Sequence, residues 1–256
     1  MAARATGDRM PTFRIMSYHI NGCRTAAGDI APDLCARVIR SQRPDLVMVQ
    51  QIGAPEGTSS LKILSENVGL SSFGPDAEGA CAYLSRFPLH NVREFPLGHG
   101  GLCLRADLDL GGERIHLFNL CLSFDPWQRR DQVRELLGEQ LLNNPSLPCA
   151  AIVSGDFTFP LWGCGQIRLS EHLRRAGLPL WRANYPGNFP LWGRDRIYFR
   201  GNLRALAGTV VGTADARKAS PHLPLVLTVE SNETRRFLKL KEHAPLRKAQ
   251  PDPACG

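Results

Sequence analysis

The stretch of sequence that decides the fold is Ala151-Ile-Val-Ser-Gly-Asp-Phe-Thr158. The apolar run from Ala150 to Val153 is typical of a strand that is covered on both faces. Gly155 lets the backbone turn where the strand ends, and Asp156 follows at the carboxyl end, where sheet proteins commonly place their chemistry. Taken alone, such an Asp is more often a turn cap. Four other segments strengthen the functional interpretation because each also places polar residues near a strand end.

Composition indicates a folded protein and leaves its partner open. The chain has 256 residues, 43% of them hydrophobic, which is enough for one large α/β domain or two small ones. The net charge of +7 fits a phosphate-rich partner such as nucleic acid, but it is also a common route to solubility. No run approaches the roughly 18 apolar residues of a membrane span. The first ten residues lack the apolar stretch of a secretory signal, so we expect a cytoplasmic location.

The cysteines give no metal or redox motif by spacing alone. There are eight of them, and no pair has the C-x-x-C spacing of a zinc ribbon. Most lie in apolar runs, where Cys behaves as a small hydrophobic residue. We therefore expect free thiols in a reducing compartment.

The rest of the chain alternates between strand and helix patterns. We expect a loose arm over residues 1–11, one domain over 12–230 and a basic, disordered tail over 231–256. Besides the central strand, the patterns predict strands at 13–18, 46–49, 81–84, 102–110, 114–120, 194–199, 209–211 and 223–229. They predict helices at 33–41, 61–68, 125–142 and 169–176, and a long irregular loop at 179–193.

Seven short motifs occur in a fixed order along this pattern. They are Tyr18-His-Ile-Asn-Gly22, Val49-Gln-Gln51, Leu84-Ser-Arg-Phe-Pro88, Asn119-Leu-Cys-Leu122, Gly155-Asp-Phe-Thr158, Asp195-Arg-Ile197 and Ser220-Pro-His-Leu-Pro224. No single motif is specific, but the ordered set resembles the endonuclease/exonuclease/phosphatase, or DNase-I-like, superfamily. The resemblance runs from about Phe13 to Glu230. It implies a four-layer α/β/β/α sandwich, in which two mostly antiparallel sheets face each other with helices outside.

The resemblance also implies hydrolysis of phosphoester bonds with a divalent metal ion, Mg²⁺ or Mn²⁺. Carried over position by position, it implies three sets of site residues. The catalytic set is Asp156, His222, Asp195 and Asn119. The metal set is Gln51 and Asp156, and the residues that contact the substrate phosphate are Asn21, Thr158 and His19.

Several polar positions depart from the family's pattern. Gln51 stands in place of a metal-binding Glu, His19 in place of an Asn, Cys121 in place of a His, and Thr158 in place of a phosphate-binding Asn. Pro221 replaces an Asp that we expect to orient the catalytic His, so His222 is predicted to lack its usual partner. The apolar scaffold residues survive, which predicts a folded protein with weakened metal chemistry.

Three hypotheses follow from these departures. The first is a non-catalytic member that binds a phosphate-containing ligand or nucleic acid, or that regulates a protein partner not specified by the sequence. The second is an active metal-dependent phosphodiesterase, phosphatase or nuclease in which another acid, Asp215 or Glu230, serves His222. The third is a Zn²⁺ site built from His19, Cys121, Asp156 and His222. The alternative to the third hypothesis is that Cys121 is a small buried hydrophobic residue and His19 a hydrogen-bonded residue of the interior. The site then has no cofactor.

Overall fold

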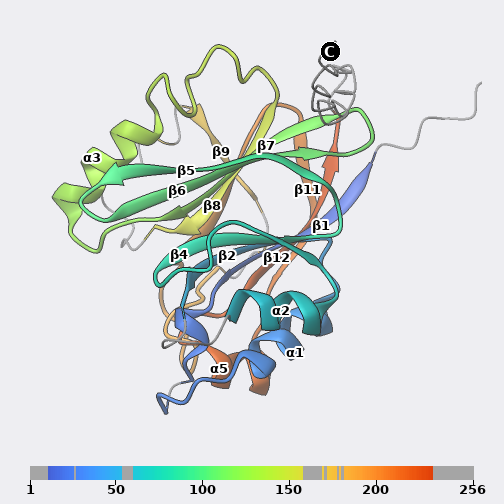
Figure 1. Ribbon diagram of the computed structural model, residues 1–256, viewed down its shortest axis with the longest axis vertical. Coiled ribbons are helices and arrows are strands. Elements are labelled where there is room, and N and C mark those ends of the chain that lie inside the picture. The colour runs from blue at the N-terminus through green and yellow to red at the C-terminus, as the bar shows by residue number, and fades with distance from the viewer. Residues whose placement is uncertain are drawn as a thin grey trace, which may run out of the picture.

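Two six-stranded sheets pack face to face in the computed structural model, with helices outside them (Figure 1). The structure describes residues 11–25, 27–53, 60–157, 169, 172–177, 179 and 182–232. Apart from Pro11, Ser231 and Asn232, the expected arm and tail lie outside these residues, and the domain boundaries stay a prediction. The predicted sandwich of two sheets with outer helices is confirmed.

The first sheet has the strand order β11-β12-β1-β2-β4-β3. Strands β1 and β2 run parallel, because helix α1 connects them, while the other neighbouring strands are antiparallel. The bounds of its strands are β1 Thr12–His19, β2 Leu46–Ile52, β3 Ser71–Phe73, β4 Ala80–Ser85, β11 Leu203–Val210 and β12 Leu225–Ser231. Its outer face is covered by helices α1 Pro32–Gln42, α2 Ser60–Val68 and α5 Ala214–Ala219 (Figure 1).

The second sheet has the strand order β5-β6-β7-β8-β10-β9. Strands β7 and β8 are parallel and are connected through helix α3, and the remaining pairs are antiparallel. The strands are β5 Leu89–Gly98, β6 Gly101–Asp109, β7 Arg114–Cys121, β8 Ala150–Asp156, β9 Arg174–Arg175 and β10 Asp195–Arg200. Helix α3, Pro126–Leu136, packs on the outer face through Val133 and Leu136.

The main core lies between the two sheets and is built from strand residues of both. Met48 of the first sheet and Ile152 of the second belong to one buried cluster. All seven residues of β8 are buried, as the apolar run at its start predicts for a strand covered on both faces. This packing holds the carboxyl end of β8, and with it Asp156, in a fixed place between the layers.

Some local predictions were wrong, and each error has a physical reason. Helix α3 ends at Leu136 instead of 142, because the chain turns at Gly138, a poor helix former whose N–H bonds to Glu135. The helix predicted over 169–176 is confirmed at its start, where Leu169 and His172 are helical, but it gives way to strand β9 at Arg174–Arg175, because pairing with β10 overrides the local helical pattern there. Strand β5 was missed because it contains Pro96, which an edge strand tolerates.

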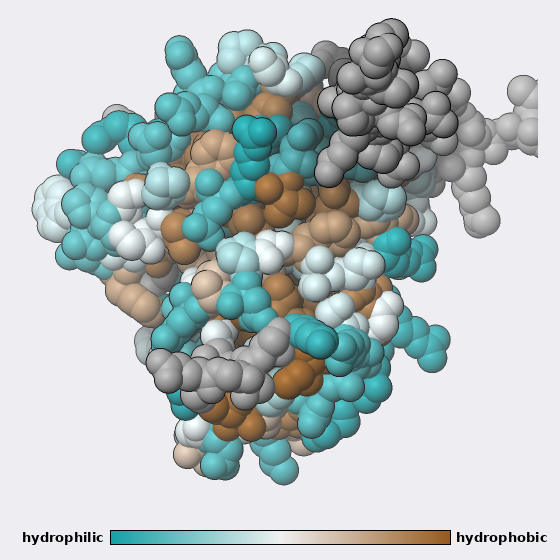
Figure 2. Space-filling view, in the orientation of Figure 1, coloured by the Kyte–Doolittle hydropathy of each residue, from teal (hydrophilic) through white to brown (hydrophobic). Residues whose placement is uncertain are grey.

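The molecule presents a largely hydrophilic rim in Figure 2, with hydrophobic side chains appearing mainly across the middle, over the two sheets. Among the residues described, no helix is long and apolar enough to cross a membrane.

Candidate functional site

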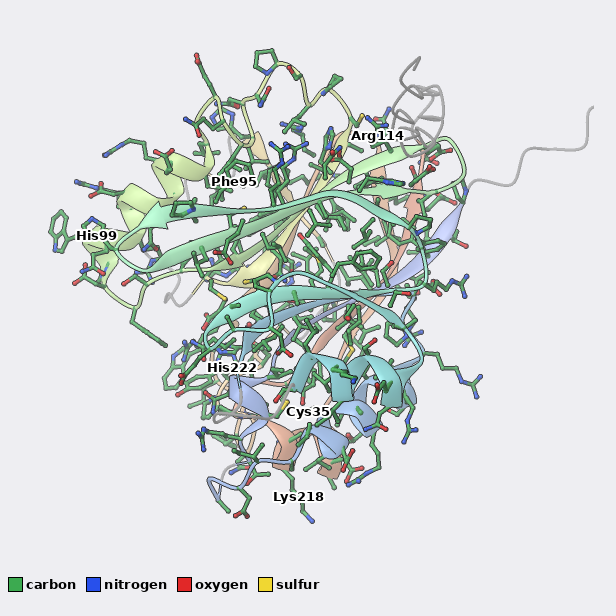
Figure 3. All side chains as sticks on the ribbon, in the orientation of Figure 1. Cys35, Phe95, His99, Arg114, Lys218 and His222 are labelled. Carbon is green, nitrogen blue, oxygen red and sulfur yellow. The ribbon has the colours of Figure 1, made fainter. Side chains whose placement is uncertain are left out.

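Four buried polar side chains meet where strands of both sheets end. His19 closes β1 and Asp156 closes β8, while Asp195 opens β10 and His222 lies in the loop before β12. Asp195 is the direct antiparallel neighbour of Asp156, which places the two carboxylates side by side. The exposed fractions of these residues are 5% or less. In Figure 3, His222 lies to the lower left and Arg114, at the start of β7, to the upper right.

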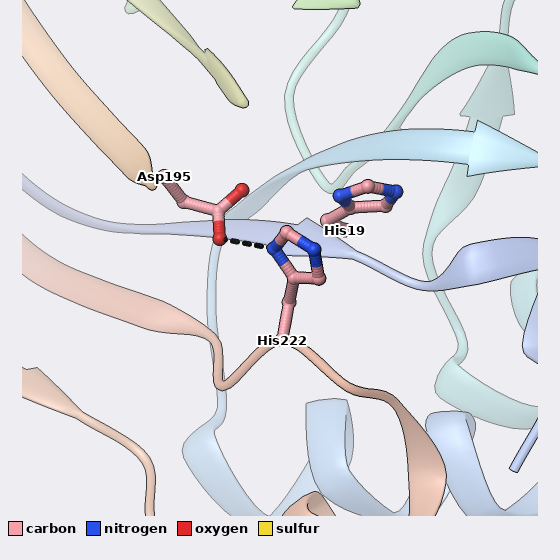
Figure 4. Close-up of side chains that lie close together, drawn as sticks. All are labelled: His19, Asp195 and His222. Carbon is pink, nitrogen blue, oxygen red and sulfur yellow. Dashed lines mark hydrogen bonds and ion pairs between the residues drawn. The ribbon is translucent and has the colours of Figure 1, made fainter. Parts of the chain in front are cut away.

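His222 and Asp195 form a hydrogen-bonded pair. His222 Nδ1 lies 2.7 Å from Asp195 Oδ2 (Figure 4). Because the carboxylate is the acceptor, Nδ1 carries the proton and Nε2 is the nitrogen left for chemistry. The expectation that His222 lacks a partner was therefore wrong. Its partner comes from the Asp195-Arg-Ile197 motif and not from position 221.

The two acids suggested as substitute partners for His222 lie elsewhere. Asp215 is half-exposed and pairs with Arg37 at 3.5 Å. Glu230 lies on β12 opposite Thr12, at the start of β1, whereas the site is at the end of that strand. Neither acid serves His222.

Asn184 fixes the carboxylate of Asp195. Its Nδ2 donates to Asp195 Oδ2 and, at 3.1 Å, to the carbonyl of Leu223. Its Oδ1 accepts the backbone N–H groups of Arg194 at 3.0 Å and of Asp195 at 3.3 Å. Asn184 is fully buried, so these bonds hold the loop before β10 against the loop that carries His222.

Asp156 is held by two positively charged side chains. Arg194 Nη2 donates to Asp156 Oδ2 at 2.7 Å, and its Nε donates to Oδ1 at 3.4 Å, which is a bidentate arrangement. His19 Nδ1 lies 3.4 Å from Asp156 Oδ2, an ion-pair distance without the alignment of a hydrogen bond. The Arg194 guanidinium also covers the ring of Tyr185 at 4.3 Å and that of Phe124 at 4.9 Å.

These contacts shift two protonation equilibria in opposite directions. Burial lowers the pKa of His19, but the contact with Asp156 and the charge of Asp195 outweigh it and raise this pKa to about 9. Burial raises the pKa of Asp156, but His19, His222 and Arg194 outweigh it and hold this pKa well below the ordinary value. At neutral pH, His19 is therefore cationic and Asp156 anionic.

The aromatic rings at the site lie in a row, with neighbouring ring planes tilted by 48° and 50°. The ring centroid of His222 lies 4.0 Å from that of His19 and 4.8 Å from that of Tyr185. Ser220 holds the backbones of both histidines. Its Oγ donates to the His19 carbonyl at 2.7 Å and accepts the His222 backbone N–H at 3.1 Å. The Ser of the Ser220-Pro-His222 motif thus positions both imidazoles.

Gln51 and Asn119 differ sharply in their surroundings. Gln51 is half-buried at a bulge in β2, with a left-handed φ of 51°. Asn119 is fully buried, and its Nδ2 donates to the carbonyls of Val49 at 2.8 Å and Ala82 at 2.9 Å. Its Oδ1 accepts from Gln50 at 2.7 Å. Asn119, which the resemblance gives as catalytic, thus connects β7 to the facing sheet.

The remaining predicted residues are more scattered. Asn21 is half-buried in the turn that follows β1, with φ 50°. Cys121 pairs with Asp156 in the sheet register, but its Sγ lies 2.9 Å from Cys81 Sγ. Thr158 lies outside the described residues.

Sequence reasoning missed the residues that complete the site, namely Arg194, Asn184, Tyr185 and Ser220. A signal existed for Arg194, because it precedes Asp195, and antiparallel pairing of β8 with β10 would have placed it beside Asp156. Asn184 and Tyr185 lie in the long irregular loop, where the sequence has no periodicity that predicts a contact.

The donor set argues against a magnesium site of the expected kind. Mg²⁺ prefers charged oxygen ligands, whereas Gln51 is neutral, and Asp156 already accepts hydrogen bonds from Arg194 and lies at ion-pair distance from His19. A different group, His19, Asp195 and His222, has ligand atoms within 4.8 Å of one another and could hold a metal ion. It replaces the predicted zinc set, since it includes neither Cys121 nor Asp156. Two of its members already share the hydrogen bond at 2.7 Å.

The comparison with known families decides the chain's membership. The sequence model of the Endonuclease/Exonuclease/phosphatase family matches residues 16–222, which is more than half of the chain. The chain belongs to this family. A search of curated proteins found no match.

Solved structures of the same family have the same fold. A family protein from Bacteroides thetaiotaomicron matches with a TM-score of 0.72 and 15% identity, over 88% of this chain and all of its own. A mannosyl-6-phosphatase from the same organism matches with a TM-score of 0.71 and 16% identity, over 85% of this chain and 99% of its own. A humanized TDP2 of D. rerio matches with a TM-score of 0.69 and 16% identity, over 86% and 99%. At such identities, the likeness extends to the fold alone.

Proposed function

We propose that the protein is a phosphoester-binding member of the family in which side-chain cations replace the metal ion and hydrolysis is weakened or lost. The observation that carries the proposal is the 2.7 Å ion pair between Arg194 and Asp156. With His19 cationic, the charges of Asp156 and Asp195 are matched by those of His19 and Arg194. A site whose carboxylates are neutralised in this way offers little electrostatic attraction to a divalent cation.

The same cations suit an anionic ligand. A guanidinium has about five N–H donors, and the two bonds to Asp156 use one on Nε and one on Nη2, so the others remain for a ligand. Arg194 could therefore donate to the oxygens of a bound phosphoester while Asp156 keeps its guanidinium in place.

Exposed aromatic rings near Arg194 favour a ligand that carries a base. Phe124, which Arg194 covers, is 62% exposed, and Trp192 in the loop before Arg194 is 51% exposed. Trp127, the second residue of helix α3, is 70% exposed, and the Arg130 guanidinium lies over its ring. Aromatic rings interleaved with arginines are the usual surface for single-stranded nucleic acids. We therefore infer a nucleic-acid-type ligand, and note that one D. rerio TDP2 structure contains a single-strand DNA product.

One observation favours the alternative, an active hydrolase. The hydrogen-bonded pair of His222 and Asp195 leaves His222 Nε2 free to move a proton, which is a general acid–base arrangement. In this alternative, Arg194 and His19 stabilise the charge that develops on phosphate, a task normally performed by a metal ion.

Two assays on the full chain separate these functions. Binding of a fluorescent single-stranded oligonucleotide is measured by anisotropy with and without EDTA. Hydrolysis of bis-(p-nitrophenyl) phosphate and plasmid nicking are measured with Mg²⁺, Mn²⁺, Zn²⁺ and EDTA. We expect EDTA-insensitive binding and no metal-dependent turnover. Metal-dependent turnover that disappears in Asp156→Ala would refute the proposal, and metal-independent turnover that disappears in His222→Ala would favour the alternative.

A further inference from the structure

Two cysteine thiols from opposite sheets meet at the edge of the site. Cys81 lies on β4 of the first sheet, and Cys121 closes β7 of the second. Their Sγ atoms are 2.9 Å apart. The sulfur atoms of a disulfide are about 2.05 Å apart, so bond formation needs an approach of less than about 1 Å.

The two thiols have unequal surroundings. Cys121 is half-buried, and Cys81 is 1% exposed. Cys121 is thus the more accessible thiol and the one that an oxidant from solution reaches first, and the Cys81 sulfur lies close enough to react with the oxidised Cys121.

We propose that Cys81 and Cys121 form a reversible disulfide that joins the two sheets beside the site. The oxidant is hydrogen peroxide. The Cys121 thiolate attacks one peroxide oxygen, the O–O bond breaks, and the products are a sulfenic acid and, after protonation, water. The Cys81 thiol then attacks the Cys121 sulfur, the S–O bond breaks, and a second water leaves. Two thiols lose two electrons, and one peroxide is reduced to two waters.

The position of the bond suggests its physical consequence. It would close a loop of 40 residues between strands of different sheets. It would also engage the sulfur that accepts the Gln51 N–H, next to His19. Oxidation should thus stabilise the sandwich at this edge and fix the bulge that carries Gln51. This thiol chemistry does not depend on whether the site binds a phosphoester.

The test uses the full reduced chain and hydrogen peroxide. After brief treatment, remaining thiols are alkylated and the digested protein is examined by mass spectrometry. We expect one peptide pair joined through Cys81 and Cys121, which separates again on treatment with dithiothreitol. The oxidised chain should melt roughly 5–10 °C above the reduced one in a thermal scan without reductant.

Two variants identify the pair. Cys121→Ser should abolish both the link and the rise in melting temperature. Cys103→Ser, which alters the neighbouring buried thiol of β6, should leave both unchanged. The decisive measurement is on the unaltered chain, so it does not require that a variant folds. Peroxide-treated, folded protein in which Cys81 remains free to react with the alkylating reagent, or in which Cys81 joins a different cysteine, would overturn the proposal.

Discussion

Two buried His–Asp pairs in this molecule have the same bond length and very different surroundings. His222 Nδ1 lies 2.7 Å from Asp195, and His116 Nδ1 lies 2.7 Å from Asp107. The second pair spans two adjacent strands of one sheet, β6 and β7, as direct cross-strand neighbours. The first joins the start of a strand to a loop and lies next to a second imidazole and a second carboxylate.

The neighbours of each pair explain the difference in role. Burial raises the pKa of Asp107, but His116, Asn91 and Arg105 outweigh it and lower this pKa to about 2. All of these partners belong to β5, β6 or β7, so the network connects strands. At His222, by contrast, the chain has gathered side chains from four separate segments. A His–Asp hydrogen bond by itself therefore does not identify a functional site. The convergence of polar side chains from separate strand ends is the feature that does.

The largest effect should come from breaking the pair within the sheet. Asp107→Asn removes the buried counter-charge of Arg105 and the carboxylate that His116 Nδ1 contacts, and should lower the free energy of unfolding by about 4 kcal/mol. Urea unfolding followed by circular dichroism measures this loss. Ligand affinity of the folded fraction should not change, and a specific loss of affinity would contradict the structural role given to this pair.

A pH effect of up to about 3 kcal/mol should come from His19. Its folded pKa of about 9 lies above the ordinary value of 6.5. The stabilisation is therefore fully present below pH 6.5 and is lost as the pH rises through about 9. Urea unfolding at pH 6.5 and 9 should show this loss in the wild type and a clearly smaller loss in His19→Asn. Equal losses in both proteins would place the titration elsewhere.

Arg194 should dominate ligand binding. Arg194→Gln removes a charged donor worth about 2 kcal/mol, so oligonucleotide affinity should fall by roughly 30-fold. Arg86→Gln is the matched control, since Arg86 follows β4 at the far end of that sheet and its side chain is 60% exposed. Anisotropy titrations measure both, and an equal loss in the two variants would mean that binding depends on overall charge only.

The smallest effect should come from Ser220, which positions both imidazoles. Ser220→Ala removes the bond to the His19 carbonyl and the acceptor for the His222 N–H, and should lower the free energy of unfolding by about 1 kcal/mol. The His222 ring signals in an NMR spectrum should also shift, while those of His116 stay in place. Unchanged His222 signals would mean that Ser220 does not position the ring.

The structural features that depend on the local sequence pattern could be predicted from the sequence. Apolar runs located most of the strands, and the ordered motifs located Asp156, Asp195 and His222 at the ends of strands. The bond between Asp195 and His222 could not be derived in the same way, because Asp215 and Glu230 were equally available acids until the fold separated them. Arg194 was missed because its role depends on the register of β8 with β10. Strand β9 was missed because its partner, and not its own pattern, determines its conformation.

The central claim is that Arg194 and His19 occupy the electrostatic role of a metal ion at Asp156. Calorimetric titration with Mg²⁺ or Mn²⁺ tests it directly, using the wild type and the double variant Gln51→Glu, Arg194→Gln, which supplies a carboxylate and frees Asp156. We predict no measurable binding at millimolar concentration in the wild type and measurable binding in the double variant. Micromolar binding by the wild type, lost in Asp156→Ala, would contradict the claim.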